Sequence, residues 1–256
     1  MPGLGASFGG RGAATNFQQD LANSDCILIM GSNMAEAHPV GFRWPMKAKE
    51  KGAPLIHVDP RFSRTSALCD LFVGIRAGSD VAFLGGLVNY VLTHGKWFEE
   101  YVRAYTNAAT IIEEGYEDAE DLAGLFSGFR PEKGGYDPQA GHWSYEGANS
   151  SPPQKKSEPG QHGTHGYGLM GVAEHGGRPH TDPTLQHPRC VFQILRRHFS
   201  RYTPEAVADV CGCRAEEVIR VAELLCANSG RERTSAIVYA VGWTQHTTGV
   251  QIIRTA

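Results

Sequence analysis

The sequence predicts an α/β fold, a doubly wound and mostly parallel sheet with helices on both faces and a long irregular insertion. Two observations support this prediction. Short apolar runs alternate with longer helical patterns from residue 26 to residue 93, and a further apolar run follows near residue 235. Between them lies a stretch rich in Gly, Pro, His, Ser and charge, which buries too little apolar surface to offset its ordering entropy.

Three segments are therefore expected. Residues 1–106 form an α/β segment, residues 107–187 an irregular Gly/Pro/His-rich insertion, and residues 188–256 a helical segment that returns to the sheet. The crossovers between parallel strands are expected to be right-handed.

The strands are predicted where short runs are rich in branched apolar residues. In chain order they are Cys26–Met30, Pro54–Val58, Leu68–Ile75 and Ser235–Val241. Polar turns are expected after the first strand, at Gly31–Pro39, and after the last, at Gly242–Gly249.

The helices are predicted from apolar residues at helical spacing and from start and stop signals. Thr203 is expected as an N-cap, with Pro204 at the first helical position. The expected helices are Val40–Lys51, Asp80 to about Thr93, Trp97 to about Thr106, one that begins with the segment His187–Val191 and runs to about Ser200, one beginning at Pro204, Arg214–Asn228 and Val250–Ala256.

The composition excludes several classes of function. The chain is 41% hydrophobic and 20% charged with a formal net charge of -3, which argues against a nucleic-acid-binding surface. No apolar run approaches the roughly 20 residues needed to cross a bilayer. Residues Met1–Gly12 are rich in glycine and lack the pattern of a signal peptide.

The six cysteines include no C-x-x-C pair, so their spacing indicates no zinc or iron–sulfur site. Cys26 and Cys226 are expected to be core thiols. Cys211-Gly212-Cys213 is interpreted as a loop between two helices, with a redox pair as the alternative. The insertion carries four histidines at irregular spacing without a partner ligand, so no metal site is expected at His162, His165, His175 and His180.

Residues suited to a nucleotide follow four of the predicted strands, and ligands of parallel sheets bind at the carboxyl ends of the strands. Backbone N–H groups at Gly31 suit a pyrophosphate. Asp59 can accept hydrogen bonds from ribose hydroxyls, and Arg61 can neutralise phosphate. Asp80 can accept from the N1–H and amino group of guanine, a donor edge that adenine lacks.

Each of these residues has a structural alternative. Asp80 is well suited to be the N-cap of the following helix, and Asp59-Pro60 is a common turn. Asn33, Glu36 and His38 could cap a helix. The coincidence of these features at strand ends favours a nucleotide-type ligand.

Other nucleotide and hydrolase motifs are not present. The first strand is followed by Gly-Ser-Asn-Met-Ala-Glu rather than G-x-G-x-x-G, which argues against a nicotinamide site. The chain has no Walker lysine motif and no G-x-S-x-G.

Several motifs resemble the major (alpha, catalytic) subunit of respiratory formate dehydrogenases, in the molybdopterin oxidoreductase family. The combination of Ala37–Trp44 with Leu185–Cys190 is the most specific to these enzymes. The resemblance covers nearly the whole chain outside the Gly/His-rich stretch. The matching segments are Gly31–Trp44, Val58–Thr65, Ile75–Leu84, Tyr101–Asn107, Thr184–Cys190, Ser200–Pro204 and Tyr239–His246.

The resemblance implies a bis-molybdopterin guanine dinucleotide with Mo or W, plus an iron–sulfur cluster in the complete subunit. Formate would be oxidised to carbon dioxide, and electrons would pass to an iron–sulfur subunit and a membrane cytochrome subunit. The resemblance also implies the periplasm as location, after twin-arginine export. The cofactor-binding residues that it implies are Gly31, Ser32, Asn33, Glu36, His38, Asp59, Arg61, Gly78, Ser79, Asp80, Val241 and Gln245.

The family's metal ligand, a selenocysteine or cysteine followed by histidine, has no match here, and neither do its cluster cysteines or its Val-Arg-Gly-type catalytic segment. We therefore expect an internal fragment that is inactive toward formate by itself, with no catalytic or metal-ligating residue of its own. A selenocysteine codon read as a stop would explain a start at Met1. The alternatives are another family member, such as a nitrate reductase, and a non-catalytic guanine-nucleotide or pterin-binding module.

Overall fold

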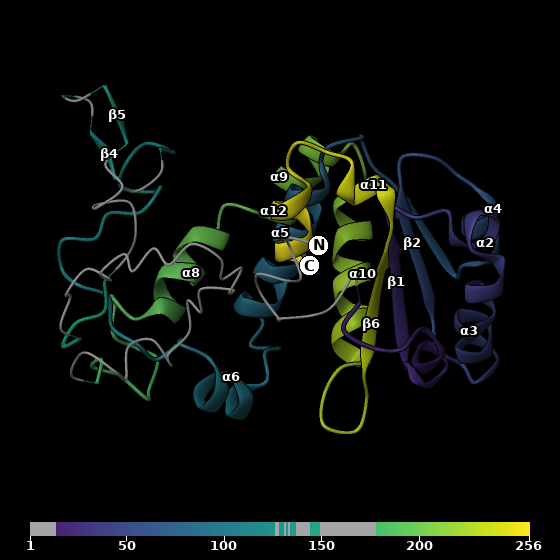
Figure 1. Ribbon diagram of the computed structural model, residues 1–256, viewed down its shortest axis with the longest axis horizontal. Helices are drawn as coiled ribbons and strands as arrows, with labels where there is room; N and C mark the ends of the chain where they lie inside the picture. Colours follow the sequence, from purple (N-terminus) through teal and green to yellow (C-terminus); the bar gives the residue numbers. More distant parts are fainter. Residues whose placement is uncertain (1–13, 126–127, 131, 133, 137–143, 149–177) are drawn as a thin grey trace, which may run out of the picture. The chain divides into compact units, whose positions relative to one another are not determined.

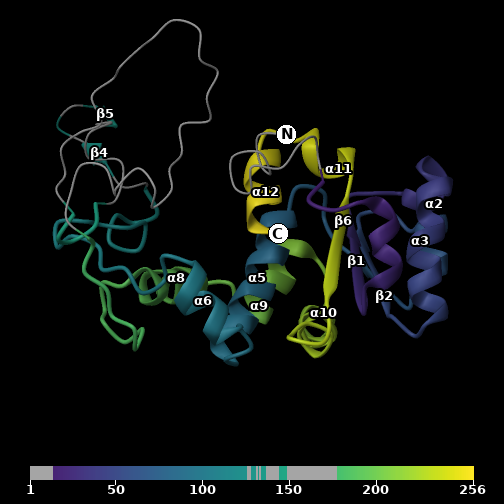
Figure 2. The same cartoon turned by 60° about the horizontal axis from the view of Figure 1, so that its bottom comes forward.

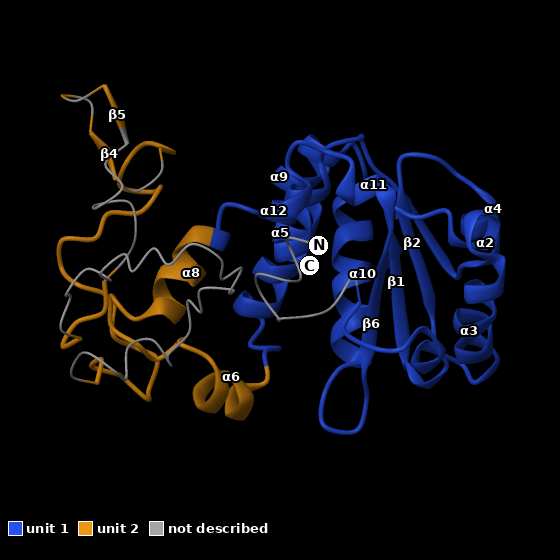
Figure 3. Ribbon diagram, viewed as in Figure 1, with its two compact units in different colours: residues 1–97, 199–256 blue, residues 98–198 orange. Residues whose placement is uncertain are grey.

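The computed structural model describes residues 14–125, 128–130, 132, 134–136, 144–148 and 178–256 (Figure 1). The chain divides into two compact units, residues 1–97 together with 199–256, and residues 98–198 (Figure 3). These units are defined by packing, whereas the three expected segments rest on composition. That three-part division stays a prediction.

The first unit contains a four-stranded sheet with the order β3-β2-β1-β6. All neighbouring strands are parallel, so the predicted doubly wound α/β class is confirmed. Because the chain runs outward from β1 to β2 and β3 on one side and places β6 on the other, the strand order reverses between β1 and β6. The strands are β1 (Cys26–Met30), β2 (Leu55–Asp59), β3 (Leu71–Gly74) and β6 (Ser235–Tyr239).

Helices cover both faces of this sheet (Figures 1 and 2). On one face, Ile27 and Leu55 pack with Phe42 of α3 (Pro39–Glu50). On the other, Leu28 and Ile56 belong to a larger core built with α5, α9, α10 and α12. Alternate strand residues therefore serve opposite layers, as the pleat requires. The helices of the larger core are α5 (Asp80–Thr93), α9 (Pro204–Cys211), α10 (Ala215–Ala227) and α12 (Gly249–Thr255).

The expected helices agree with the structure to within a few residues. Thr203 is confirmed as the N-cap of α9, because its side chain accepts a hydrogen bond from Ala206 N at 3.2 Å. The 3-10 helix η1 (Gln18–Asn23) packs on α3 and was not expected.

Two expected turns contain helical segments, and two strands are shorter than predicted, since β3 begins later and β6 ends at Tyr239 rather than Val241. The turn after β1 includes α2 (Met34–Ala37), and the turn after β6 includes α11 (Val241–Thr244). The third strand begins at Leu71, because α4 (Arg64–Leu68) occupies the start of the predicted range. Asp70 determines this change: its N–H donates to Leu55 O, and its Oδ2 accepts from Leu55 N, both at 2.8 Å.

The second unit is largely irregular where it is described. It contains α6 (Glu99–Tyr105), α8 (Val191–Phe199) and a small antiparallel pair, β4 (Phe129–Arg130) and β5 (Gly135–Tyr136). Single β-bridges join distant parts of the chain, including Thr110 with Thr181 and Ile111 with Cys190.

The histidines of the insertion are described only in part. His162, His165 and His175 lie outside the described residues, and His180 Nδ1 lies 3.2 Å from Glu146 Oε1. Among the residues that the structure describes, no three His, Cys, Asp or Glu side chains come together as a metal site would require. No described helix is both long and apolar enough to cross a bilayer.

The cysteines are free thiols in this structure. Cys26 is fully buried in β1, and Cys226 is half-buried on α10. Cys211 ends α9, and Gly212 follows as a left-handed C-cap with a φ of 73°. The Cys211-Gly212-Cys213 segment therefore joins two helices, as interpreted from the sequence.

Candidate functional site

The parallel sheet brings the four predicted segments to one edge. Asp59 ends β2, Gly31 follows β1, and the Gly78–Asp80 segment follows β3. Val241 begins α11, directly beyond β6. Because the strands are parallel and adjacent, these segments lie side by side at their carboxyl ends (Figure 1).

Two glycines form the centre of this edge, where the strand order reverses. Gly31 has a φ of 63°, which is left-handed, and Gly242 N donates to Gly31 O at 3.0 Å. A Cβ added at Gly31 would lie 2.6 Å from Trp243 Cδ1, and one at Gly242 would lie 2.6 Å from Gly31 O. The two backbones can approach only because neither residue has a side chain.

Ser32 provides a buried hydroxyl beside this glycine contact. The residue is 4% exposed, and its Oγ has no hydrogen-bond partner among the described residues. Buried polar groups normally have a partner, so this hydroxyl is available for a hydrogen bond to a ligand at the carboxyl edge.

A polar network holds the segment after Ser32. Thr65 Oγ1 donates to Asn33 Oδ1 at 2.9 Å and accepts from Ala35 N at 3.0 Å. Asn33 Nδ2 in turn donates to Glu36 Oε2 at 2.5 Å. This hydrogen bond, with Arg64 nearby, lowers the pKa of Glu36. Thr65, on α4, thus fixes the start of α2.

The capping alternative for this segment is only half right. Asn33 and His38 occupy the N-cap positions of α2 and α3, but neither side chain makes a capping hydrogen bond. The Asn33 side-chain amide instead donates to Glu36, and the His38 side chain is exposed.

His57 lies beneath the Ser32 turn and was not predicted as a site residue. It is fully buried, with Nδ1 2.8 Å from Ser66 Oγ and Nε2 3.1 Å from Ser32 O. Its Nε2 also lies 3.9 Å from Asp59 Oδ2. Burial lowers the pKa of His57, and the Asp59 carboxylate opposes this effect. One feature of the sequence could have identified His57 as a site residue: it is a polar residue at a core-facing position of an otherwise apolar strand.

Asp59 and Arg61 form the turn after β2. Asp59 Oδ1 accepts a hydrogen bond from Arg61 N at 2.9 Å. One carboxylate oxygen of Asp59 therefore has the turn-forming role that the structural alternative predicted. The Arg61 side chain is exposed and close enough to Glu36 to favour its ionised form. The carboxylate of Asp59 retains capacity for further hydrogen bonds.

Asp80 is buried at the start of α5. It is 6% exposed, and its Oδ1 accepts from Trp243 Nε1 at 3.0 Å. Burial raises the pKa of Asp80; nearby Asp59 raises it further, whereas the Trp243 hydrogen bond and His246 lower it. The alternative of Asp80 as N-cap is wrong, because Ser79 occupies that position and Asp80 is the first helical residue.

The remaining predicted residues differ in their surroundings. Ser79 Oγ donates to Arg76 O at 2.6 Å, and Gly78 has a φ of 86°. Val241 is the first residue of α11, Gln245 follows its last residue, and both are exposed. Hydrogen bonds and electrostatic contacts therefore link the Gly31–Glu36 segment with Asp59 and Asp80. They run through residues that sequence reasoning missed: His57, Thr65, Ser66, Trp243 and His246.

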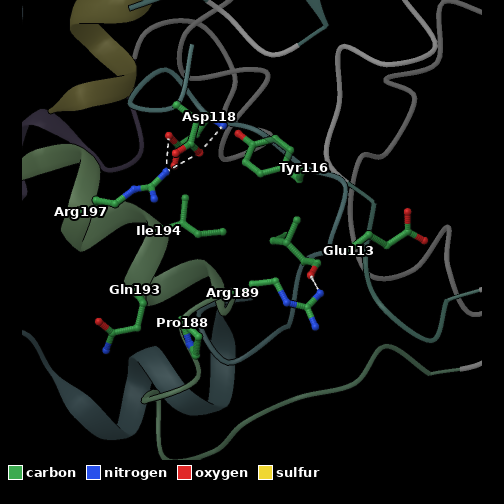
Figure 4. Close-up of a pocket in the computed structure, with 10 residues that line it drawn as sticks. Glu113, Tyr116, Asp118, Pro188, Arg189, Gln193, Ile194 and Arg197 are labelled. Carbon is green, nitrogen blue, oxygen red and sulfur yellow. Dashed lines mark hydrogen bonds and ion pairs between the residues drawn. The ribbon is translucent and has the colours of Figure 1, made fainter. Parts of the chain in front are cut away.

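The second unit contains a separate pocket of about 110 Å³ (Figure 4). Arg197 lies on its wall and bridges Asp118 and Asp121, each at 2.6 Å. Tyr116 also lines it, and burial raises the pKa of that phenol. The other lining arginine, Arg189, pairs with Glu146, which does not line the pocket.

Comparison with known proteins identifies the family. A family model described as molybdopterin oxidoreductase matches residues 4–256. The chain belongs to the molybdopterin oxidoreductase family. Membership in this family supports a molybdopterin cofactor.

Several proteins similar to this chain are formate dehydrogenase subunits. The formate dehydrogenase subunit alpha of Megalodesulfovibrio gigas is 44% identical over 96% of this chain and 21% of its own length. The formate dehydrogenase 2 subunit alpha (cytochrome c-553) of Nitratidesulfovibrio vulgaris is 44% identical over 99% of this chain and 22% of its own length. The formate dehydrogenase-O major subunit of Escherichia coli is 43% identical over 96% and 21%. The chain thus spans about a fifth of each relative's length.

A solved structure shares the fold. Acetylene hydratase from Pelobacter acetylenicus matches with a TM-score of 0.52 and 17% identity, over 92% of this chain and 20% of that chain. At this identity the likeness shows the fold alone.

The carboxyl edge carries residue types that suit a nucleotide-type ligand. Gly31 and Gly242 bring two backbone segments together at the strand reversal, and Ser32 has a hydroxyl without a partner among the described residues. Asp59 and Asp80 add carboxylate oxygens, which are hydrogen-bond acceptors.

Proposed function

We propose that this chain forms part of the cofactor-binding region of a formate dehydrogenase catalytic subunit, and that it binds the guanine dinucleotide of a molybdopterin cofactor. The observation that carries this proposal is the convergence of the unpaired Ser32 hydroxyl with Asp59 and Asp80 at the reversal of strand order. This combination offers a phosphate contact and two sets of acceptors at one edge of the sheet.

Each group has a distinct part in binding. The Gly31 backbone and the Ser32 hydroxyl contact the pyrophosphate, and Arg61 compensates its charge. Asp59 accepts from the ribose hydroxyls. Asp80 accepts from the N1–H and amino group of guanine while Trp243 Nε1 holds one of its oxygens. The predicted positions Glu36, His38, Val241 and Gln245 form the outer boundary of this site.

When bound, a metal pterin would supply the two-electron redox chemistry that formate oxidation requires. This chain's residues bind and orient the cofactor, and we assign none of them as a catalytic residue or metal ligand. The metal, Mo or W, and an iron–sulfur cluster belong to the proposal for the complete subunit.

Electron transfer to partner subunits and a periplasmic location are also proposed. The names of the relatives support the first, since they are alpha or major subunits and one is named with cytochrome c-553. An iron–sulfur subunit and a membrane cytochrome subunit are the partners that we propose.

Nucleotide selectivity tests the binding proposal. Calorimetry on the purified chain should show tighter binding of GDP than of ADP, because adenine lacks the donor edge that Asp80 recognises. Asp80→Asn should abolish this preference. Asp70→Asn is the matched control, since Asp70 pairs with Lys49 at the start of β3, away from the carboxyl edge. Equal affinity for GDP and ADP, or no binding of either, would contradict the proposal.

The coding DNA on both sides of this chain tests the formate assignment. We expect an in-frame cysteine or selenocysteine codon followed by a histidine codon upstream, with cluster cysteines before it. Flanking DNA without such coding sequence would contradict the assignment of formate oxidation. The nucleotide-binding proposal would then depend only on the calorimetry with GDP and ADP.

A further inference from the structure

His57 connects the two loops that follow β1 and β2. Its ring lies 3.1 Å from the carbonyl oxygen of Ser32 and 3.9 Å from the carboxylate of Asp59. The first is a residue of the proposed pyrophosphate loop and the second the proposed ribose ligand. The ring itself is fully buried, so it reaches a ligand only through these neighbours.

The partners of His57 determine its tautomer. Ser32 O is a carbonyl and can only accept, so Nε2 must carry the proton and donate to it. In the neutral ring Nδ1 then accepts from the hydroxyl of Ser66 at 2.8 Å. The Ser66 oxygen also accepts from Ser63 N at 2.8 Å. The hydrogen bonds therefore run in one direction, from Ser63 N–H through Ser66 and His57 to Ser32 O.

A second contact from the same helix supports the same turn. Thr65, the residue before Ser66 on α4, accepts from Ala35 N and donates to Asn33 Oδ1. Two adjacent residues of α4 thus position this turn. Ser66 acts on the Ser32 carbonyl through His57, and Thr65 contacts the start of α2 directly. The loop after β1 is positioned by α4, which belongs to the connection between β2 and β3.

We infer that His57 is a positioning residue, which in its Nε2–H tautomer fixes the Ser32 turn relative to Asp59 for binding of the guanine dinucleotide. This inference rests on the proposed function for its ligand. One hydrogen bond, from His57 Nε2 to Ser32 O, accounts for the contribution of His57 to the affinity for the dinucleotide. The bond between Nδ1 and Ser66 only orients the ring.

Two amide variants separate these hydrogen bonds. In His57→Gln the side-chain amide reaches as far as Nε2 and can donate to Ser32 O, but no acceptor remains at the Nδ1 position. In His57→Asn the oxygen occupies the position of Nδ1 and can accept from Ser66, but the donor to Ser32 is lost. Both variants place a buried polar amide of similar chemistry at the same position, so each is a control for the other.

GDP binding to the purified chain is the measurement, at equal folded fraction as judged by circular dichroism. We expect His57→Asn to bind GDP about tenfold more weakly than wild type, the scale of one lost buried hydrogen bond. His57→Gln should stay within about threefold of wild type. Equal weakening by both variants, or wild-type affinity in both, would overturn the inference.

Nitrogen NMR of the imidazole tests the tautomer without any ligand. We expect a pyrrole-type Nε2 and a pyridine-type Nδ1 in the wild-type chain. A neutral ring with its proton on Nδ1 would refute the inference, because Nε2 would then have no proton to donate to Ser32 O.

Hydrogen exchange distinguishes failure of this inference from failure of the proposed function. The amide of Gly242 donates to Gly31 O and reports on the order of the Gly31–Ser32 turn. It should exchange faster in His57→Asn than in His57→Gln. If wild type binds no GDP, the proposed function fails while the exchange and NMR results still decide the role of His57. Equal exchange in the two variants would count against that role.

Discussion

Trp243 Nε1 donates a hydrogen bond to Asp80 Oδ1 at 3.0 Å, across 163 positions of sequence. Trp243 is fully buried on α11, after β6, whereas Asp80 begins α5, after β3. These strands are the two ends of the sheet order. The bond therefore connects the segments that follow the two outer strands, and it gives the buried Asp80 carboxylate a partner within the protein.

We expect Asp80→Asn to flatten the pH dependence of stability. Burial raises the pKa of Asp80 above 3.8, so the folded chain holds this proton more tightly than the unfolded chain. The contribution of Asp80 to stability is therefore complete below pH 3.8 and is lost as pH rises through the raised pKa. Guanidinium unfolding between about pH 4 and pH 8 should show a smaller fall in the free energy of unfolding for the variant. An unchanged pH profile would show that Asp80 titrates normally.

Gly31→Ala should destabilise the chain more than Gly52→Ala. Both positions have positive φ, but only at Gly31 would the new Cβ overlap Trp243. We expect losses in the free energy of unfolding of about 2–5 kcal/mol at Gly31, from strain plus overlap, and about 1–2 kcal/mol at Gly52, from strain alone. Chemical denaturation measures both. Equal losses would mean that the indole moves aside without cost.

The loop after Asp182 should open at acid pH. The Asp182 carboxylate accepts from the backbone N–H groups of Thr184, Gln186 and His187 and from the Thr184 hydroxyl. These hydrogen bonds lower the pKa of Asp182 well below 3.8. Their stabilising contribution is present above the unfolded pKa and lost as pH falls through the folded one. Hydrogen exchange of the three amides should therefore show protection that declines only at strongly acid pH, and Asp182→Asn should remove much of it at neutral pH. Protection that persists in Asp182→Asn would assign the loop's order to other contacts.

The cysteines should react slowly with alkylating reagents. Burial raises the pKa of Cys26 and Cys213 to about 11 and that of Cys69 to about 12. Because the thiolate is the nucleophile, these thiols should be alkylated by iodoacetamide at about pH 8 much more slowly than in the unfolded chain. Mass spectrometry after timed alkylation, with a guanidinium-unfolded control, measures this. Rapid alkylation of Cys213 in the folded chain would revive the redox alternative for Cys211-Gly212-Cys213.

Local patterns were sufficient for most of the elements. The apolar run at Cys26–Met30 and the Thr203-Pro204 helix start both appear in the structure as predicted, because burial of a strand and N-capping depend on neighbouring residues. The third strand was misplaced at its start, since Asp70 exchanges hydrogen bonds with Leu55, fifteen residues earlier. No local pattern reports that pairing.

The sequence by itself determined the α/β class, the family and the four segments that follow the strands, because hydrophobic periodicity and contiguous motifs are properties of the chain. Only the tertiary structure decided which side chains connect these segments. His57 looked like one polar residue in an apolar strand, and it became a candidate only when the fold placed it between Ser32 and Ser66. Trp243 and Asp80 likewise meet only because parallel strands bring their carboxyl ends to one edge. Hydrogen bonds between distant residues depend on geometry that local sequence does not encode.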